Sequence, residues 1–312
     1  MITTVTLNPA LDKILQLNSL KVGELNPVEK SLEKAGGKGI NVARIVHKLN
    51  REVLAISLMG GYTGEVLQRI IKEEGIPSSI IDIQEKTREN IKIVEKSGSE
   101  TEINQKGCLD IKDYHKFLEN FKNEIKKTDL LVLSGSLPQG LPSDTYCQLI
   151  ELAQKENLKT ILDTSGQALE IAINSKPYLI KPNIAELRSL FKLELRKISD
   201  IITAAKSIIA KGVNTVVISL GAKGALYIQK NCYYHLRPPL LKIAETTVGA
   251  GDSMVAGLAI AISENMSLKE MSKYSTALAS LFVSGGPIDE ENIDLMKDKL
   301  RVIDEVAVDE IV

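Results

Sequence analysis

Val53-Leu54-Ala55-Ile56-Ser57-Leu58-Met59 is followed closely by an amphipathic stretch, Thr63–Glu74, that stops at Gly75. The first run is apolar on both faces, as a strand of a covered parallel sheet is. The second carries its apolar residues at helical spacing, and the glycine after it is a common helix stop. Those apolar positions are Val66, Leu67, Ile70 and Ile71. This part of the sequence therefore predicts a strand followed by a helix.

The same alternation extends through the chain in both directions. Asp200–Lys211 repeats the helical pattern and ends at Gly212. Further short, apolar and often β-branched runs predict strands at Ile2–Leu7, Leu130–Leu133, Thr160–Asp163, Tyr178–Ile180 and Thr215–Leu220. Repeated strand–helix–strand units predict an α/β fold with a mostly parallel sheet. Ligands of such sheets bind at the carboxyl ends of the strands.

Two stretches interrupt the alternation, at residues 13–34 and 88–106. They hold short alternating segments such as Asn90-Ile91-Lys92-Ile93-Val94, which are too short for strand–helix–strand units. We interpret them as small antiparallel strands that form a discontinuous flap beside the main sheet, and the alternative is two long surface hairpins. No repeat, proline-rich linker or charge block divides the chain. We therefore expect residues 1–312 to form a single domain with this flap.

Composition excludes several classes of protein. The chain has 39 basic and 40 acidic residues, so it lacks the basic excess with which proteins grip nucleic acids, and its 4% aromatic content disfavours base stacking. The three cysteines form no C-x-x-C pair, which argues against a zinc site or disulfide framework and suits the cytoplasm. Apolar stretches fall short of a membrane span, and the N-terminus has the pattern of a strand and not of a signal peptide.

The strongest chemical signal is Val248-Gly249-Ala250-Gly251-Asp252-Ser253, which leads into an apolar helical run. A Gly-Ala-Gly turn at a helix start leaves backbone N–H groups unpaired and uncovered, which makes an anion-binding site. A carboxylate beside such amides suits a site where negative charge develops while Asp252 takes a proton. The alternative is that Asp252 only caps an ordinary helix.

A second glycine cluster, Ala35-Gly36-Gly37-Lys38-Gly39-Ile40-Asn41, opens another predicted helix. It suits close approach of the backbone to a polar ligand, and a plain turn is the alternative. The cluster is neither a Walker loop nor the dinucleotide fingerprint.

Three further segments follow predicted strands. Asn183 and Glu186 are spaced to face one site across a helical turn and to suit Mg²⁺ held through water, although a capping box fits the same spacing. Ser219–Leu226 ends a strand in glycines, so it could lay a nucleotide against the backbone or simply form a hairpin turn. Ser134-Gly135-Ser136 offers hydroxyls and amides.

Taken in this order, the segments resemble the ribokinase-like sugar kinases, also called the phosphofructokinase B family. The resemblance runs from Thr6-Leu7-Asn8-Pro9-Ala10-Leu11-Asp12 to the helix after Asp252 and includes two signatures, Ala35–Asn41 and Thr246–Ser253. It implies a Rossmann-like α/β core with helices on both faces, a small β lid, ATP as the phosphoryl donor, and Mg²⁺. The expected partners are therefore ATP and a small-molecule sugar phosphate, and composition argues against a nucleic acid or membrane partner. Exposed lid strands often pair, so a homodimer through them is a further expectation.

The resemblance assigns roles to residues of this sequence. Asp252 would be the general base, and the amides around Gly249, Ala250 and Gly251 would form the anion hole. The residues implied to bind the substrate are Asp12, Gly37, Lys38, Asn41, Arg88, Asn90, Asn104 and Ser136, with Lys38 and Arg88 on its phosphate. The residues implied to bind ATP are Lys181, Asn183, Ser219, Gly221, Gly224, Thr247, Gly249 and Gly251. Asn183 and Glu186 would hold Mg²⁺ through water.

Within the family, the sequence is similar to the branch that phosphorylates sugar phosphates. Thr87-Arg88-Glu89-Asn90-Ile91-Lys92 looks most like the Arg-x-Asn-x-Lys of 1-phosphofructokinases, although Glu89 replaces the expected apolar residue. Fructose 1-phosphate is thus the expected acceptor, with tagatose 6-phosphate and fructose 6-phosphate as alternatives. A non-catalytic sensor of sugar phosphates or nucleotides is the alternative from another class, and the presence of Asp252 argues against it.

Overall fold

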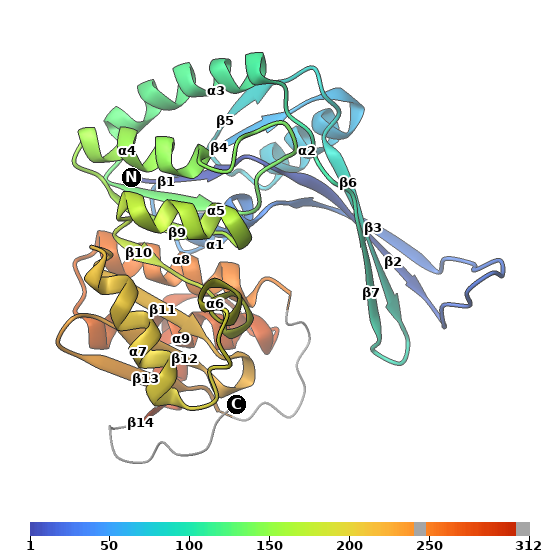
Figure 1. Ribbon diagram of the computed structural model, residues 1–312. Coiled ribbons are helices and arrows are strands. Elements are labelled where there is room, and N and C mark those ends of the chain that lie inside the picture. Colours follow the sequence, from blue (N-terminus) through green and yellow to red (C-terminus); the bar gives the residue numbers. More distant parts are fainter. Residues whose placement is uncertain (240–247, 304–312) are drawn as a thin grey trace.

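A computed structural model describes residues 1–239 and 248–303 of the 312-residue chain. It contains a ten-stranded sheet and a separate four-stranded sheet. The large sheet lies within a body of helices, and the small sheet projects from that body on one side (Figure 1). No helix among these residues is long and apolar enough to cross a membrane.

The large sheet is parallel through most of its width. Its strands in spatial order are β14 (Arg301–Ile303), β13 (Tyr233–Arg237), β12 (Ala225–Ile228), β11 (Thr215–Ser219), β10 (Leu179–Ile180), β9 (Lys159–Asp163), β8 (Leu130–Ser134), β1 (Ile2–Thr6), β4 (Val53–Met59) and β5 (Ser78–Asp82). Neighbours pair in parallel from β11 to β5, and in antiparallel fashion from β11 to β14. The parallel strands therefore bring their carboxyl ends to one edge.

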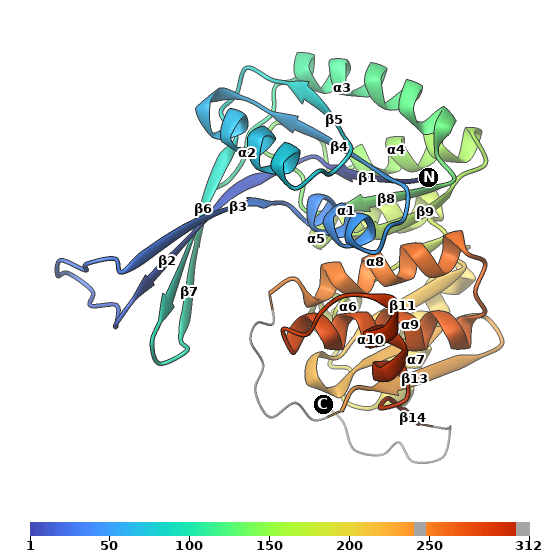
Figure 2. The same ribbon diagram turned by 180° about the vertical axis from the view of Figure 1, so that it is seen from behind.

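Helices cover both faces of this sheet, each face over its own apolar cluster. One layer, seen in front in Figure 1, consists of α3 (Ile111–Glu124), α4 (Thr145–Lys155), α5 (Gly166–Ala172), α6 (Ile184–Phe191) and α7 (Ile198–Ala210). The other, seen in Figure 2, consists of α1 (Lys38–Lys48), α2 (Gly61–Glu73), α8 (Ala250–Ser263), α9 (Leu268–Val283) and α10 (Glu290–Lys297). Short 3-10 turns lie at Ile125–Lys127, Ile173–Ser175 and Gly221–Lys223.

Helix α8 is buried almost along its whole length, from Asp252 to Ile262. Its small residues allow this, because a Cβ added at Gly257 would lie only 2.7 Å from the Cα of Ser275 on α9. Apolar side chains on all sides are the expected pattern for such a central helix. The packing fixes where the first turn of α8 stands relative to the strand ends.

The small sheet has the strand order β3-β2-β6-β7, and its strands are β3 (Lys30–Gly36), β2 (Ala10–Leu17), β6 (Arg88–Glu95) and β7 (Glu100–Asn104). These come from the two stretches that interrupt the strand–helix alternation. The prediction that they are all antiparallel is wrong for the central pair, since β2 and β6 run parallel. Two hairpins, β2–β3 and β6–β7, are joined side by side through β2 and β6.

The six strands predicted in the large sheet are confirmed to within a residue or so, as is the mostly parallel α/β class. The sequence pattern missed β5 and the antiparallel strands β12 to β14. All three cysteines are free thiols, as expected.

Candidate active site

Charged side chains converge where β9 and β10 end. Asp163 is the last residue of β9 and is only 1% exposed, and its carboxylate pairs with Lys181 Nζ at 3.1 Å and Lys38 Nζ at 3.2 Å. Burial acts to raise the pKa of Asp163, but the two ammonium groups outweigh it and the pKa is lowered. Ser134 Oγ, at the end of β8, donates to the same carboxylate at 3.2 Å. The cluster therefore holds an ionised carboxylate between two cations.

The first turn of α8 lies beside this cluster. Gly249 is the N-cap and adopts φ 96°, and a Cβ there would lie 2.8 Å from Phe282 Cζ, so both conformation and space require glycine. A Cβ at Gly251 would be 3.6 Å from Lys181 Nζ, which places that ammonium against the helix start. Unpaired amides of a first turn and an adjacent cation together attract an anion such as a phosphoryl group.

Asp252 stands in that same turn and is 7% exposed. Burial raises its pKa to about 6, and the nearby Asp163 adds to the rise, while Asn41, Lys38 and Lys181 oppose it. Asn41 Nδ2 donates to Asp252 Oδ2 at 2.8 Å. A carboxylate with a pKa near 6 is mostly ionised at neutral pH and is well matched to accept a proton there.

Lys38 and Asn41 lie at the start of α1, in the glycine cluster Ala35–Asn41. Gly37 is the N-cap of α1 with φ 126°, and a Cβ there would lie 2.7 Å from Thr6 Cγ2. Helix α1 thus starts in close contact with the end of β1. Its first turns direct Lys38 to Asp163 and Asn41 to Asp252.

The expected substrate residues of the small sheet form a row. The strand register sets Asp12 opposite Asn90 and Asn90 opposite Asn104, so the three residues share one face across β2, β6 and β7. Asn90 Nδ2 donates to Asp12 Oδ1 at 2.8 Å. Burial raises the pKa of Asp12, while Asn90 and Arg88 act to lower it. A row of amide and carboxylate groups can donate to and accept from sugar hydroxyls.

Arg88 lies at the base of that row. Its guanidinium donates to Asn90 Oδ1 and Gln105 O at 3.0 Å each and to Asn8 O at 3.2 Å. Asn8 Nδ2 donates to Ser136 Oγ at 3.0 Å. Asn8, which follows β1, thus contacts two predicted substrate residues, Arg88 and Ser136. Arg88 therefore lies beside Asp12 and Asn90.

Lys38 and Arg88, which the resemblance places on one phosphate, have different partners in the structure. Lys38 pairs with Asp163 and is influenced by Asp252 and Glu186, whereas Arg88 is influenced by Asp12. Attraction to the buried carboxylate of Asp163 explains this position. The structure thus places Lys38 with Lys181 on the side of the site next to α8.

The predicted nucleotide loop follows β11. Gly221 and Gly224 adopt φ 61° and 89°, and a Cβ at Gly224 would lie 1.8 Å from Leu236 O. Ser219, the end of β11, forms a bridge with Asn183, so the loop adjoins the start of α6. This places Ser219, Gly221 and Gly224 along the same edge as Lys181. Thr247, also predicted to bind ATP, lies outside the described residues.

Asn183 and Glu186 form the capping box that was the alternative to a metal site. Asn183 Oδ1 accepts from Glu186 N and Glu186 Oε2 accepts from Asn183 N, both at 2.8 Å. No group of three or more His, Cys, Asp or Glu residues is arranged for a metal in the described part of the chain. These side chains fit Mg²⁺ that is held mainly by phosphates and water, which is its usual mode beside nucleotides.

Asp163 and Arg44 were not among the predicted site residues. A charged residue at the end of the buried run Thr160–Asp163 was a usable signal, because such strand ends meet at the ligand edge. Arg44 gave no signal beyond its spacing three residues after Asn41, to whose Oδ1 it donates at 2.6 Å.

Comparison with known proteins shows the family to which the chain is similar. The sequence model described as "pfkB family carbohydrate kinase" matches residues 5–287. A 1-phosphofructokinase of Bacillus subtilis is 36% identical over 86% of this chain and 88% of its own length. A tagatose-6-phosphate kinase of Staphylococcus epidermidis is 33% identical over 97% of this chain and its full length. The crystal structure of phosphofructokinase-2 from Escherichia coli in complex with potassium superimposes with a TM-score of 0.88, at 31% identity over 95% of this chain and 98% of that one.

Proposed function

The chain belongs to the pfkB family of carbohydrate kinases, and from this premise we propose that it transfers a phosphoryl group from ATP to C6 of fructose 1-phosphate. The products are fructose 1,6-bisphosphate and ADP. The observation that carries the proposal is the buried Asp252, which stands in the first turn of α8 beside Lys181. Phosphoryl transfer to a hydroxyl needs a base that takes the hydroxyl proton and a site that binds the phosphoryl group, and here the two lie side by side.

The mechanism follows from these positions. Asp252 accepts the proton of the C6 hydroxyl, whose oxygen forms the new bond to the γ-phosphorus as the bond to the β-γ bridging oxygen breaks. The amides of Gly249, Ala250 and Gly251, with Lys181 and Lys38, stabilise the negative charge on the transferring group. Phosphoryl transfer depends mainly on positioning and charge stabilisation, and one well-placed donor is worth roughly 10²–10³ in rate.

ATP lies along Ser219, Gly221 and Gly224 in this proposal, with its phosphates directed toward Lys181. Mg²⁺ would be held by those phosphates and through water by Asn183 and Glu186, and it would supply charge neutralisation. Glu186 is close enough to Lys38 for the two charges to influence each other, which supports a place at the phosphate edge.

The sugar binds against the small sheet, which we propose acts as a lid formed by about residues 13–34 and 88–106 within one kinase domain. Asp12, Asn90, Asn104, Asn41, Gly37 and Ser136 are the proposed contacts to its hydroxyls. Arg88 binds the phosphate that the substrate already carries, because its planar fork suits a phosphate. Lys38 is assigned to the transferring phosphoryl group instead.

We also propose that two copies pair through their lids and that the enzyme works in the cytoplasm. Exposed apolar side chains on the lid support pairing, and a structure of Escherichia coli phosphofructokinase-2 is described as tetrameric. The three free thiols are compatible with a reducing compartment.

The test is a coupled ADP-release assay over a panel of ketose phosphates. We expect kcat/KM to be highest for fructose 1-phosphate, lower for tagatose 6-phosphate and fructose 6-phosphate, and very low for free fructose, because each charge-assisted contact to the phosphate is worth about 1.5–3 kcal/mol. A higher value for tagatose 6-phosphate would overturn the substrate but not the reaction.

The control for chemistry is Asp252→Asn, which keeps size and polarity but cannot accept the proton. We expect kcat to fall by roughly 10²–10⁴ with little change in KM. A variant that keeps more than about a tenth of the wild-type kcat would show that Asp252 is no base and would favour the non-catalytic reading.

A further inference from the structure

Arg44 on α1 is held by three acceptors near the proposed base. Its Nε donates to Glu74 Oε2 at 2.8 Å, its Nη1 to Asn41 Oδ1 at 2.6 Å, and its Nη2 to Ala35 O at 2.7 Å. Glu74 follows α2, and Ala35 lies near the end of lid strand β3. A planar fork bound on three sides cannot turn away from Asn41 without losing the other contacts.

This contact decides which way the Asn41 amide points. A guanidinium has five donors and no acceptor, so the group that faces Arg44 must be the amide oxygen, Oδ1. The amide nitrogen then points the other way, and it donates to Asp252 Oδ2 at 2.8 Å. Reversal of the amide would set an N–H against the cation and an oxygen against the carboxylate.

We propose that Arg44 is a positioning residue, which fixes the orientation of the Asn41 amide so that Asn41 donates to Asp252 and keeps that carboxylate ready to accept a proton. The proposal deepens the proposed function and rests on Asp252 as its base. Arg44 itself touches neither substrate nor the reacting atoms in this account. Its effect reaches Asp252 through one intervening side chain.

The balance of charges around Asp252 makes this orientation consequential. Asp163 faces it from β9 and disfavours its ionised form, while Lys38 and Lys181 favour it. A donated hydrogen bond also favours the ionised form, whereas an amide oxygen in its place would favour the protonated form. With Arg44 present, Asn41 works with the two lysines. Without Arg44, the amide is free to turn and accept from a protonated Asp252.

The experiment compares the pH dependence of kcat/KM for the wild type and Arg44→Met, which keeps much of the aliphatic stem. The acid limb of the wild type should follow Asp252, whose pKa is raised by burial to about 6. We expect the acid limb of the pH profile of the variant to shift to higher pH by about half a pH unit to one pH unit. The rate would then fall roughly two- to fivefold at pH 6 and change little at pH 8.5, by the protonated fraction alone.

Two variants serve as controls. Arg44→Lys keeps the positive charge and a donor, so it should return the acid limb to near the wild-type position. Arg51→Met is the matched control, because Arg51 is similarly exposed and its guanidinium is also held by three acceptors, Glu264, Glu290 and Leu49 O. Arg51 makes none of the contacts described for Asp252, and its replacement should leave the limb in place.

A limb that stays in place in Arg44→Met, or a rate that drops equally at all pH values, would overturn the proposal and make Arg44 a structural residue. If Arg44→Met does not fold, Arg44→Gln replaces it, since glutamine is too short to reach the same acceptors and should shift the limb in the same direction. A carbon-13 NMR titration of the Asp252 carboxyl, assigned with Asp252→Asn, needs no substrate. We expect it to show the same upward shift even if fructose 1-phosphate proves not to be the acceptor, so failure of the two proposals can be told apart.

Discussion

In the proposed mechanism, Asp252 is a residue at which function and stability conflict. Its pKa is raised by burial to about 6 from the ordinary value of 3.8, so ionisation costs more in the folded than in the unfolded protein. Below the pKa that Asp252 has in the unfolded chain, the side chain is neutral in both states and this cost is absent. As pH rises through about 6, the folded protein must carry the buried charge, and the free energy of unfolding is lower by that cost. A neutral residue at this position avoids that loss.

We therefore expect Asp252→Asn to be more stable than the wild type, by about 1–3 kcal/mol at pH 8 and by less at pH 5. Urea unfolding at the two pH values measures the difference. A gain in stability that is equal at pH 5 and pH 8, or absent at both, would contradict the assigned cause.

Asp163 has the opposite role, because it neutralises two cations. Lys181 is 6% exposed, so removal of the carboxylate leaves a buried ammonium group without its partner. Such a change costs about 3–5 kcal/mol in other proteins. We expect Asp163→Asn to lower the free energy of unfolding by about that amount, measured in urea at pH 7.

The matched control is Asp129→Asn, which alters an ion pair with the N-terminus whose carboxylate is 77% exposed. Exposed pairs contribute about 0–1 kcal/mol, so this variant should unfold almost like the wild type. Equal effects of the two substitutions on the free energy of unfolding would mean that the Asp163 cluster is solvated and is worth no more than an exposed ion pair.

The sequence predicts part of this site for a physical reason. Gly249 and Asp252 are recognisable because a glycine turn and a carboxylate at a helix start are local features with local consequences. The partners of Lys38 and Asp252 are not local, since Asp163 lies 125 positions from Lys38 and Asn41 lies 211 positions from Asp252. Spacing along the chain carries no information on such contacts, so the ion pair of Lys38 with Asp163 could not be predicted from the sequence.

At the scale of elements, the start of α6 forms a capping box from Asn183 and Glu186, and the proposed Mg²⁺ role of Glu186 can be tested separately from its role as a cap. Glutamine at the third helical position also completes a capping box. Glu186→Gln should therefore leave stability nearly unchanged, while the loss of charge raises the Mg²⁺ concentration needed for half the maximal rate. A Mg²⁺ titration of the rate, beside a thermal melt, measures both.

The chain supplies a matched control in α9, where Ser267 and Glu270 form the same kind of capping box away from the site. Glu270→Gln should change neither the Mg²⁺ requirement nor the melting temperature by much. If both variants leave the Mg²⁺ titration in place, Glu186 is a cap alone.

The lid strands show that strand positions can be predicted from a sequence, whereas the direction of pairing between distant strands cannot. Alternating residues predict that 13–34 and 88–106 contain strands, because side chains of a strand alternate between its faces. The direction of pairing between β2 and β6 depends on how two distant hairpins dock, and β2 and β6 pair in parallel from Ala10–Arg88 to Leu17–Glu95. That register sets Asp12 beside Asn90, a contact that the separate hairpin patterns do not contain.

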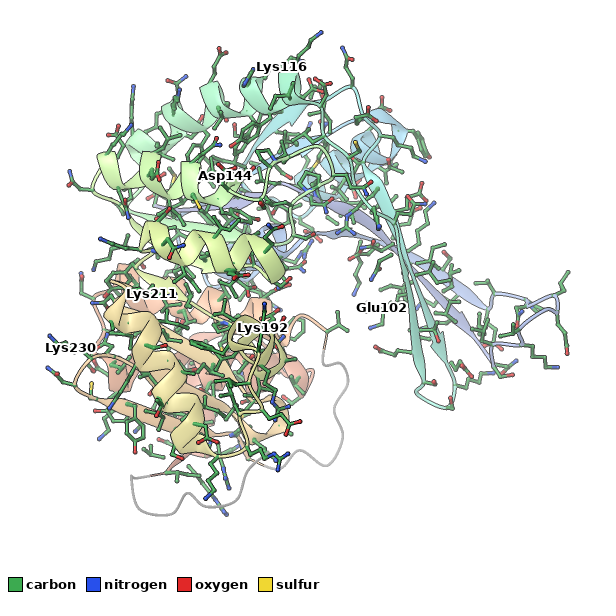
Figure 3. All side chains as sticks on the ribbon, viewed as in Figure 1. Glu102, Lys116, Asp144, Lys192, Lys211 and Lys230 are labelled. Carbon is green, nitrogen blue, oxygen red and sulfur yellow. The ribbon has the colours of Figure 1, made fainter. Side chains whose placement is uncertain are left out.

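At the scale of the whole molecule, the parallel body and the lid divide the proposed work. The strand ends of the body carry the charges for ATP and phosphoryl transfer, and the lid carries the polar row for the sugar. Figure 3 shows Glu102 on the lid, away from Lys192 and Lys211, which follow the body helices α6 and α7. Arg44 joins the two parts, since it contacts Ala35 of the lid strand and Asn41 of the body helix.

The lid also exposes apolar surface that a single copy leaves in water. Val22 and Leu25, in the β2–β3 connection, are 94% and 88% exposed. Burial of one such side chain is worth about 1.5–3 kcal/mol, and a two-fold interface buries each one twice. We expect the wild type to sediment as a dimer and the double variant Val22→Asp, Leu25→Asp to sediment as a monomer, because it loses this area and adds charges that pairing would have to desolvate.

Sedimentation velocity over a range of concentrations makes the comparison, with Leu295→Asp as the control. Leu295 is 53% exposed but lies on α10 of the body, away from the lid, so its replacement should leave the dimer intact. A wild type that stays monomeric, or a double variant that still dimerises, would rule out pairing through these side chains. Because the lid also carries the sugar row of Asp12, Asn90 and Asn104, loss of the dimer should raise KM for the sugar phosphate more than KM for ATP.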